Sequence, residues 1–372
     1  MLPDQGLKNN SKNEQTILSI EGLKTYFFLQ NDFIKAVDGA SLWMNKGEVL
    51  ALVGETGSGK TITAHSTLGL LDSAPGIVEG KIIFDNINLL EDLDRFSKIE
   101  NDGETEIVKK DLKGWDKIHQ RRLTPVRGRK VTMIFQEPVS SLDPYYTIGE
   151  QLTETILFTH PSKKRAEARD LALEWLRELY LEPPGSYFGK YAWQLSGGEC
   201  QRAMIAMALA PDPELLIADE PTTSLDASTE AEIIGLLHEL RTKYKLSILF
   251  ISHDINIVLG FAAKIAVMFN GISVELFPVE FLKEENRKNI HPYTQKLFLD
   301  DKDKKPPAKD EGMFFSKERG KSQKILSRGC KYLPFCPYFS EIQKDISNYC
   351  KKSPPPQVQT EKGHWVSCWR YA

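Results

Sequence analysis

The chain has 372 residues, 41% hydrophobic and 27% charged, which is enough to bury the core of one large or two moderate globular domains. Its net charge of −3 lacks the basic excess of a nucleic-acid binder, so we expect no nucleic-acid partner. No apolar run is long enough to span a membrane and the polar N-terminus lacks a signal-peptide core, so we expect the chain to stay in the cytoplasm.

The N-terminal part opens with a polar stretch, residues 1–16, which we predict to be a disordered tail. A strand-like pattern begins at Ile17. Within it, Phe27 lies a few tens of residues before a glycine-rich loop, where its ring could stack on a purine. Tyr26 is the adjacent option, and packing in the core is the alternative for both rings.

The glycine-rich loop reads GETGSGKT, with the spacing G-x-x-x-x-G-K-[ST], and it follows a short apolar run typical of a buried strand. Backbone N–H groups of such a loop point at phosphate oxygens, and the next helix adds the positive end of its dipole. Lys60 supplies charge for the β- and γ-phosphates, and Thr61 supplies a hydroxyl for Mg²⁺. The residues that we predict to bind nucleotide here are Gly54, Glu55, Thr56, Gly57, Ser58, Gly59, Lys60 and Thr61.

A charged stretch follows an alternating, strand-like segment over Gly80–Leu90. Twelve of the residues from Glu91 to Asp111 are charged, eight of them acidic, with little apolar periodicity. We therefore predict a solvated loop, and treat residues 91–118 as a charged insertion.

A second apolar strand, Val131–Gln136, ends in a glutamine that could reach Mg²⁺ or an attacking water. The alternative for Gln136 is a simple strand cap. Residues 148–182 carry helical periodicity, which predicts a small helical subdomain at about 140–195.

The segment LSGGECQR leads into a helix rich in Ala and Met. Ser196, Gly197 and Gly198 offer backbone donors at the N-terminus of that helix, which predicts a second anion site. One nucleotide does not need two such loops, so we expect nucleotides to be shared between subunits.

Two later strands end in polar residues. LLIADE ends in Asp219, which suits the Mg²⁺ shell, and Glu220, which suits a general base that orients water. A structural ion pair is the alternative for these carboxylates. His253 follows the strand Ser247–Ser252 and could sense a γ-phosphate, whereas a lone histidine is commonly structural.

The C-terminal extension, residues 276–372, contains a charged linker at Asp300–Gly312 and four cysteines separated by five, thirteen and seventeen residues. Four thiolates can hold tetrahedral zinc or a [4Fe–4S] cluster, and the spacing does not choose between them. We predict a metal-cluster segment at 328–372, with the ligands Cys330, Cys336, Cys350 and Cys368.

Taken in order over roughly Ile17–Gly271, these motifs closely resemble the nucleotide-binding subunit of ABC transporters. The segments QEPVSSLDP and HPYT are further similar to the oligopeptide/dipeptide importer ATPases. The resemblance implies an α/β fold, with a RecA-like P-loop ABC domain at 17–275 that carries antiparallel β and helical subdomains. It also implies an adenine-stacking Phe27, a Q-loop Gln136, an Mg²⁺-site Asp219, a catalytic Glu220 and a switch His253.

By the same resemblance, the chain is expected to hydrolyse ATP with Mg²⁺ bound through Thr61, Gln136 and Asp219, and to power peptide import. The implied partners are a second, homologous ATPase subunit in a heterodimer, two transmembrane permease subunits and, indirectly, an extracellular substrate-binding protein. That would place the chain on the cytoplasmic face of the membrane. The family's cysteine-bearing tail favours an iron–sulfur cluster over zinc, with free thiols or disulfides as the remaining alternative. Import of oligosaccharides or nickel, a soluble ABC ATPase unconnected with transport, and an iron–sulfur sensor remain alternatives.

Overall fold

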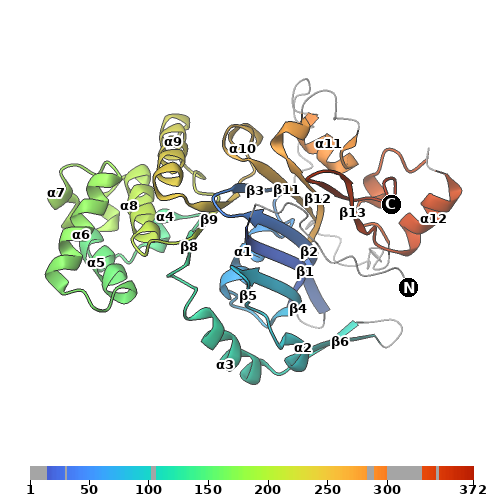
Figure 1. The fold of residues 1–372 in the computed structure, drawn as a ribbon, viewed down its shortest axis with the longest axis horizontal. Helices are drawn as coiled ribbons and strands as arrows, with labels where there is room; N and C mark the ends of the chain where they lie inside the picture. Colours follow the sequence, from blue (N-terminus) through green and yellow to red (C-terminus); the bar gives the residue numbers. More distant parts are fainter. Residues whose placement is uncertain (1–14, 30–31, 102–105, 283–288, 300–328, 341–342) are drawn as a thin grey trace.

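The computed structural model describes residues 15–29, 32–101, 106–282, 289–299, 329–340 and 343–372. Figure 1 shows a central group of sheets, with a cluster of helices at one end and the C-terminal segment at the other. Most of the predicted N-terminal tail lies outside the described residues, although Thr16 already belongs to the first strand. The predicted linker at 300–312 also lies outside them.

The larger sheet contains eight strands among the described residues. Five of them are parallel neighbours, and the remaining three extend one edge in antiparallel pairs. In spatial order the strands are β13 (Gln357–Glu361), β14 (His364–Ser367), β12 (Ile272–Pro278), β11 (Lys264–Phe269), β3 (Val49–Val53), β10 (Ser247–Ile251), β9 (Leu215–Asp219) and β8 (Val131–Ile134).

The parallel strands are buried at every position because both faces of the sheet are covered. Alternate residues of β3 serve two separate cores. Ala51 belongs to a cluster with residues of α8 and α9, whereas Leu52 joins α1 and a second sheet. The helices that surround the sheet are α1 (Lys60–Leu68), α8 (Gly197–Leu209), α9 (Ala227–Tyr244) and α10 (Ile255–Phe261).

The second sheet is antiparallel and has the order β2-β1-β4-β5 in the described part of the chain. Its strands are β1 (Thr16–Leu29), β2 (Asp32–Asn45), β4 (Pro75–Phe84) and β5 (Ile87–Asn88). The predicted α/β class, with a parallel core and an antiparallel β part, is therefore confirmed.

The charged insertion differs from the solvated loop that we predicted. It contains α2 (Leu93–Phe96), a hairpin of β6 (Ser97–Asn101) and β7 (Glu106–Lys110), and α3 (Leu112–Leu123). Val108 is buried beside Tyr26, and the Lys110 ammonium donates to the carbonyls of Pro75 and Ile77, both at 2.6 Å. These tertiary contacts order a stretch whose composition alone predicts a loop.

The helical subdomain forms the group at one end of the molecule (Figure 1). A capping box between Thr147 and Glu150 starts its first long helix. Its elements are α4 (Pro138–Ser141), α5 (Ile148–Thr159), α6 (Arg165–Glu178), α7 (Pro184–Phe188) and η1 (Ala192–Gln194).

The C-terminal segment continues the main sheet. Strand β12 runs across the predicted domain boundary at residues 275–276, and β14 pairs with it, bringing Trp365 against Trp43 at 5.2 Å between ring centroids. The other elements of this region are η2 (Val279–Leu282), α11 (Pro292–Leu299), η5 (Leu333–Phe335) and α12 (Lys344–Lys352). Within the described ranges, no helix combines the length and apolar character that a membrane span requires.

Candidate functional site

The phosphate loop joins β3 to α1, and its backbone fits only with glycine at two positions. Gly54 has φ 149°, and a Cβ there would lie 2.2 Å from the carbonyl oxygen of Met268. Gly59, which caps α1, has φ 102°, and a Cβ there would lie 2.5 Å from the carbonyl oxygen of Ala36. The loop therefore packs directly on neighbouring backbone, which leaves its exposed tip, residues 55–57, facing outward.

Lys60 and Thr61 stand at the base of this loop. The buried Lys60 ammonium donates to the carbonyls of Gly54 at 2.8 Å and Glu55 at 3.1 Å. Burial lowers the pKa of Lys60, while the carboxylates of Glu220 and Asp219 oppose that change. The Thr61 hydroxyl donates to Asp219 Oδ1 at 3.2 Å, and burial raises the pKa of Asp219.

Glu220 lies at the centre of a polar group beyond the ends of three adjacent strands. Its Oε2 accepts from Gln136 Nε2 at 3.2 Å and from the Thr223 hydroxyl at 2.9 Å, and it lies 3.4 Å from His253 Nδ1. The Glu220 side chain is 16% exposed and the His253 side chain 63%, so the group opens to solvent on the histidine side. The structure thus brings together three predicted site residues from separate parts of the sequence.

The two candidate adenine-stacking rings differ in their surroundings. Tyr26 is 1% exposed, and its hydroxyl donates to Asp38 at 2.5 Å beneath the β6–β7 hairpin. Phe27 is half-buried in β1, opposite Ile34 of β2 and Pro75 of β4. Tyr26 is buried in the packing beneath the hairpin, so of these two rings only Phe27 is exposed enough to stack on a base.

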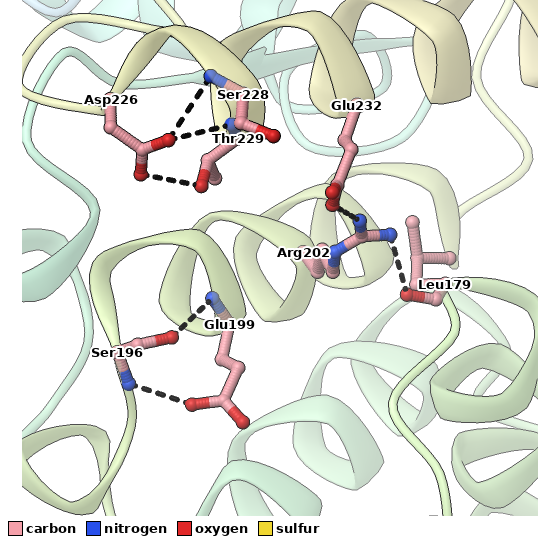
Figure 2. Close-up of polar contacts among 8 residues, drawn as sticks. All are labelled: Leu179, Ser196, Glu199, Arg202, Asp226, Ser228, Thr229 and Glu232. Atoms are coloured by element: carbon pink, nitrogen blue, oxygen red, sulfur yellow. Dashed lines mark hydrogen bonds and ion pairs between the residues drawn. The ribbon is translucent and has the colours of Figure 1, made fainter.

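The LSGGE segment forms the start of α8. The Ser196 hydroxyl accepts from the Glu199 backbone N–H at 3.3 Å, and the Glu199 carboxylate accepts from the Ser196 N–H at 2.7 Å, as Figure 2 shows. This capping box fixes the backbone of Gly197 and Gly198 at the helix end.

A pocket of about 300 Å³ opens in front of this helix end. Asp226 caps the facing helix α9 through the N–H groups of Ser228 and Thr229, and Arg202 pairs with Glu232 at 2.8 Å (Figure 2). The residues that line the pocket are Ser196, Gly197, Gly198, Glu199, Arg202, Ser224, Leu225, Asp226, Thr229 and Glu232.

The four cysteines of the C-terminal segment do not form the predicted metal site. Among the described residues, no group of three or more His, Cys, Asp or Glu is arranged to hold a metal ion. Burial raises the pKa of Cys330 to about 11 and that of Cys368 to about 12. The predicted [4Fe–4S] site at Cys330, Cys336, Cys350 and Cys368 is therefore wrong, and the zinc alternative meets the same finding.

The order of this segment has another source. Strand β14 joins the main sheet, Tyr332 packs at 5.1 Å from Phe269, and the Cys330 N–H donates to the Cys350 carbonyl at 2.8 Å. These contacts fold the segment onto the larger core, so it does not need a metal to supply a core of its own.

Two contacts at the site were missed by the sequence analysis. Thr223 donates to Glu220, and the hydroxyl of Tyr293 accepts a hydrogen bond from the Glu55 backbone N–H at 2.9 Å. Thr223 follows the predicted pair of carboxylates by only three residues and could have been found there. Tyr293 is 238 residues away from Glu55, and its only signal was the HPYT segment.

Comparison with known proteins identifies close relatives. The model of the ABC transporter family matches residues 37–223. The oligopeptide transport ATP-binding protein AppD of Bacillus subtilis is 37% identical, over 96% of this chain and 97% of AppD. The dipeptide transport ATP-binding protein DppD of Lactococcus lactis is 38% identical, over 76% of this chain and 72% of DppD. A solved dimer of the ATP-binding cassette MJ0796 with ADP and Pi is 25% identical, with a TM-score of 0.56, covering 71% of this chain and 99% of the cassette.

Proposed function

The chain belongs to the ABC transporter family, among the ATP-binding subunits of peptide importers, and we propose that its hydrolysis of ATP powers the uptake of peptides. The observation that carries the catalytic part is the position of Glu220. Its carboxylate oxygen is held by Gln136 and Thr223 beside His253, at the strand ends next to the phosphate loop.

The residues present fit MgATP. The Ser58 hydroxyl is buried and has no hydrogen-bond partner among the described residues. The Lys60 ammonium donates hydrogen bonds to two carbonyls of the loop. A phosphate group would give both side chains a partner. Thr61 and Asp219, already 3.2 Å apart, would hold Mg²⁺ together with Gln136, and the ion would supply positive charge to the phosphate oxygens. Phe27 would stack on the adenine.

Within this site the chain's own residues act mostly by position. Glu220 orients a water for attack on the γ-phosphorus and takes up its proton, while Gln136 and Thr223 fix the carboxylate. His253 would contact the γ-phosphate and sense its removal by hydrolysis. Lys60 and the loop N–H groups stabilise the negative charge of the transferred group in both ground and transition states.

The LSGGE pocket serves a second subunit. Ser196, Gly197 and Gly198 present backbone donors that the chain's own phosphate loop does not need, so they contact the nucleotide of a partner ATPase subunit. We infer a heterodimer, because the family resemblance pairs this subunit with a homologous but different one. A complex that contains two copies of this chain as its only ATPase would refute that stoichiometry.

The remaining partners are two permease subunits, which hold the chain at the cytoplasmic face of the membrane, and an extracellular binding protein that supplies the substrate. Peptides are the substrate class that agrees with the names of AppD and DppD. Oligosaccharides and nickel are the alternative cargoes, and a soluble ABC ATPase is the alternative class.

The deciding experiment is purification of the complete complex followed by reconstitution in liposomes. We expect two multi-span subunits to co-purify, and ATP-dependent accumulation of a labelled oligopeptide that Glu220→Gln abolishes. Accumulation of nickel or an oligosaccharide with no peptide uptake would reject the substrate. Full ATPase activity with no membrane subunit attached would reject the role in transport.

A further inference from the structure

We propose that Tyr293 is a positioning residue for ATP. It lies in the C-terminal segment and holds the backbone of the phosphate loop, so that nucleotide binding and the stability of the C-terminal segment are coupled. This inference rests on the proposed function, because it concerns the same nucleotide site. Nothing in the phosphate-loop motif itself requires a residue from the C-terminal segment.

The contact involves the backbone of the loop. The Tyr293 hydroxyl accepts from the Glu55 N–H at 2.9 Å, and Tyr293 is 1% exposed, so water cannot readily replace it. Lys296, one turn later in α11, lies 3.6 Å from the Glu55 carboxylate, but both side chains are largely exposed. An exposed ion pair contributes little, so the buried hydroxyl is the part that fixes the loop.

The backbone of Glu55 is thereby held on both sides of its Cα, through its N–H and through its carbonyl. Its N–H is engaged by Tyr293, and its carbonyl accepts from the ammonium of Lys60 at 3.1 Å and from the Ser58 N–H at 3.1 Å. A shift of Glu55 would therefore move the carbonyl that helps to hold Lys60. The tyrosine occupies only the Glu55 N–H, so it does not compete with phosphate for the N–H groups from Thr56 onward.

A second set of contacts ties the same tyrosine to the backbone behind the loop. Its ring packs on Phe269 at 4.7 Å and on Tyr332 at 5.6 Å between centroids. Phe269 ends β11, the strand whose Met268 carbonyl lies against Gly54. The next residue, Asn270, accepts a hydrogen bond from Lys331 Nζ at 2.9 Å. The C-terminal segment thus supports the loop from two directions.

The consequence is a reciprocal coupling. If the C-terminal segment stabilises the loop conformation that binds nucleotide, nucleotide binding must stabilise the segment by the same free energy. Loss of the Tyr332 ring, on which Tyr293 packs, would weaken ATP binding without touching the phosphate loop itself.

The test uses the full-length chain and the non-hydrolysable analogue AMP-PNP with Mg²⁺. Tyr293→Phe removes only the hydroxyl and keeps the ring packing, so we expect its dissociation constant to rise about three- to tenfold. In the reconstituted complex, KM for ATP should rise by a similar factor while kcat stays within about twofold, because the loop is used equally in ground and transition states. Amide hydrogen exchange at 292–299 and 329–340 should slow on AMP-PNP binding, and less so in the variant.

Tyr338→Phe is the matched control. Its hydroxyl also reaches α11, donating to Gln295 at 2.7 Å, but it does not contact the phosphate loop. An affinity within about twofold of the unsubstituted chain for Tyr293→Phe, or an equal loss in Tyr338→Phe, would overturn the inference while ATP binding itself persists. If the unsubstituted chain binds no AMP-PNP, the proposed function fails and this inference fails with it.

Discussion

The side-chain amide of Gln136 donates to the carboxylate of Glu220 over 3.2 Å, although 84 positions separate the two residues. The contact follows from the order of the strands. Gln136 lies beyond β8 and Glu220 beyond β9, and these strands are parallel neighbours, so their carboxyl ends meet at one edge of the sheet. His253 lies beyond β10, the next neighbour, and completes the group.

The first prediction concerns the Glu220 carboxylate. Glu220→Gln keeps the shape of the side chain but removes the charge that orients and deprotonates water. We expect nucleotide affinity to stay close to that of the unsubstituted chain while kcat falls about 10²- to 10⁴-fold. Single-turnover ATPase measurements on the reconstituted complex test this directly.

Glu137→Gln is the control for that substitution. Glu137 is exposed and its carboxylate contacts only Ser140 in the described structure. The Glu137→Gln variant should therefore hydrolyse ATP at an unchanged rate. Near-normal hydrolysis by Glu220→Gln would assign the role of base to another residue.

The second prediction concerns Lys60. Because its ammonium is buried and bonded to two loop carbonyls, Lys60→Ala removes charge that the phosphates use before and during the reaction. We expect AMP-PNP affinity to fall at least about tenfold. Lys130→Ala, which removes an exposed pair with Glu214, should leave affinity unchanged in the same titration.

Much of this site could be predicted from the sequence because strand ends are visible in it. The apolar runs before Gln136, Glu220 and His253 show where three parallel strands stop, and parallel strands bring such positions to one edge. The glycine spacing before Lys60 likewise encodes a backbone shape, which the close approach of Met268 to Gly54 explains.

The wrong and missing predictions concern contacts between residues far apart in the sequence, which no local sequence pattern indicates. The β6–β7 hairpin is rich in charge and is ordered by a few contacts, including Val108 on Tyr26. The cysteine spacing suggested a metal site, but spacing does not specify where folded side chains point. The contact of Tyr293 with Glu55 depends on how the chain returns after 238 residues.

A third prediction concerns the backbone at Gly54. Gly54→Ala would place a methyl group 2.2 Å from a backbone oxygen that cannot rotate away. We expect a loss of about 1–3 kcal/mol in the free energy of unfolding, together with loss of AMP-PNP binding. Gly235→Ala is the comparison, because that helical glycine has nothing within 4 Å of the added carbon and should gain about 0.5–1 kcal/mol. Equal effects of the two substitutions in urea unfolding would contradict the packing argument.

The last prediction is that protonation of His119 lowers the stability of the folded chain at acid pH. The ring is 5% exposed and stacks on Trp115 at 4.6 Å, and burial lowers its pKa to about 4, assisted by the charges of Lys110, Arg127 and Arg122. The folded state therefore binds the His119 proton more weakly than the unfolded state does. Its contribution is fully present above pH 6.5 and is lost as pH falls through 4, a loss of about 3 kcal/mol.

His119→Phe should remove this share of the pH dependence, because phenylalanine keeps the stack on Trp115 and does not titrate. Buried His291, with its pKa lowered to about 3, adds a loss that also begins as pH falls below 6.5 and continues to about pH 3, and the variant retains it. His238 is exposed, so His238→Gln should keep the full dependence of the unsubstituted chain. Urea unfolding between pH 7 and pH 4 measures the difference, and parallel curves for His119→Phe and the unsubstituted chain would show that His119 is not the group that titrates.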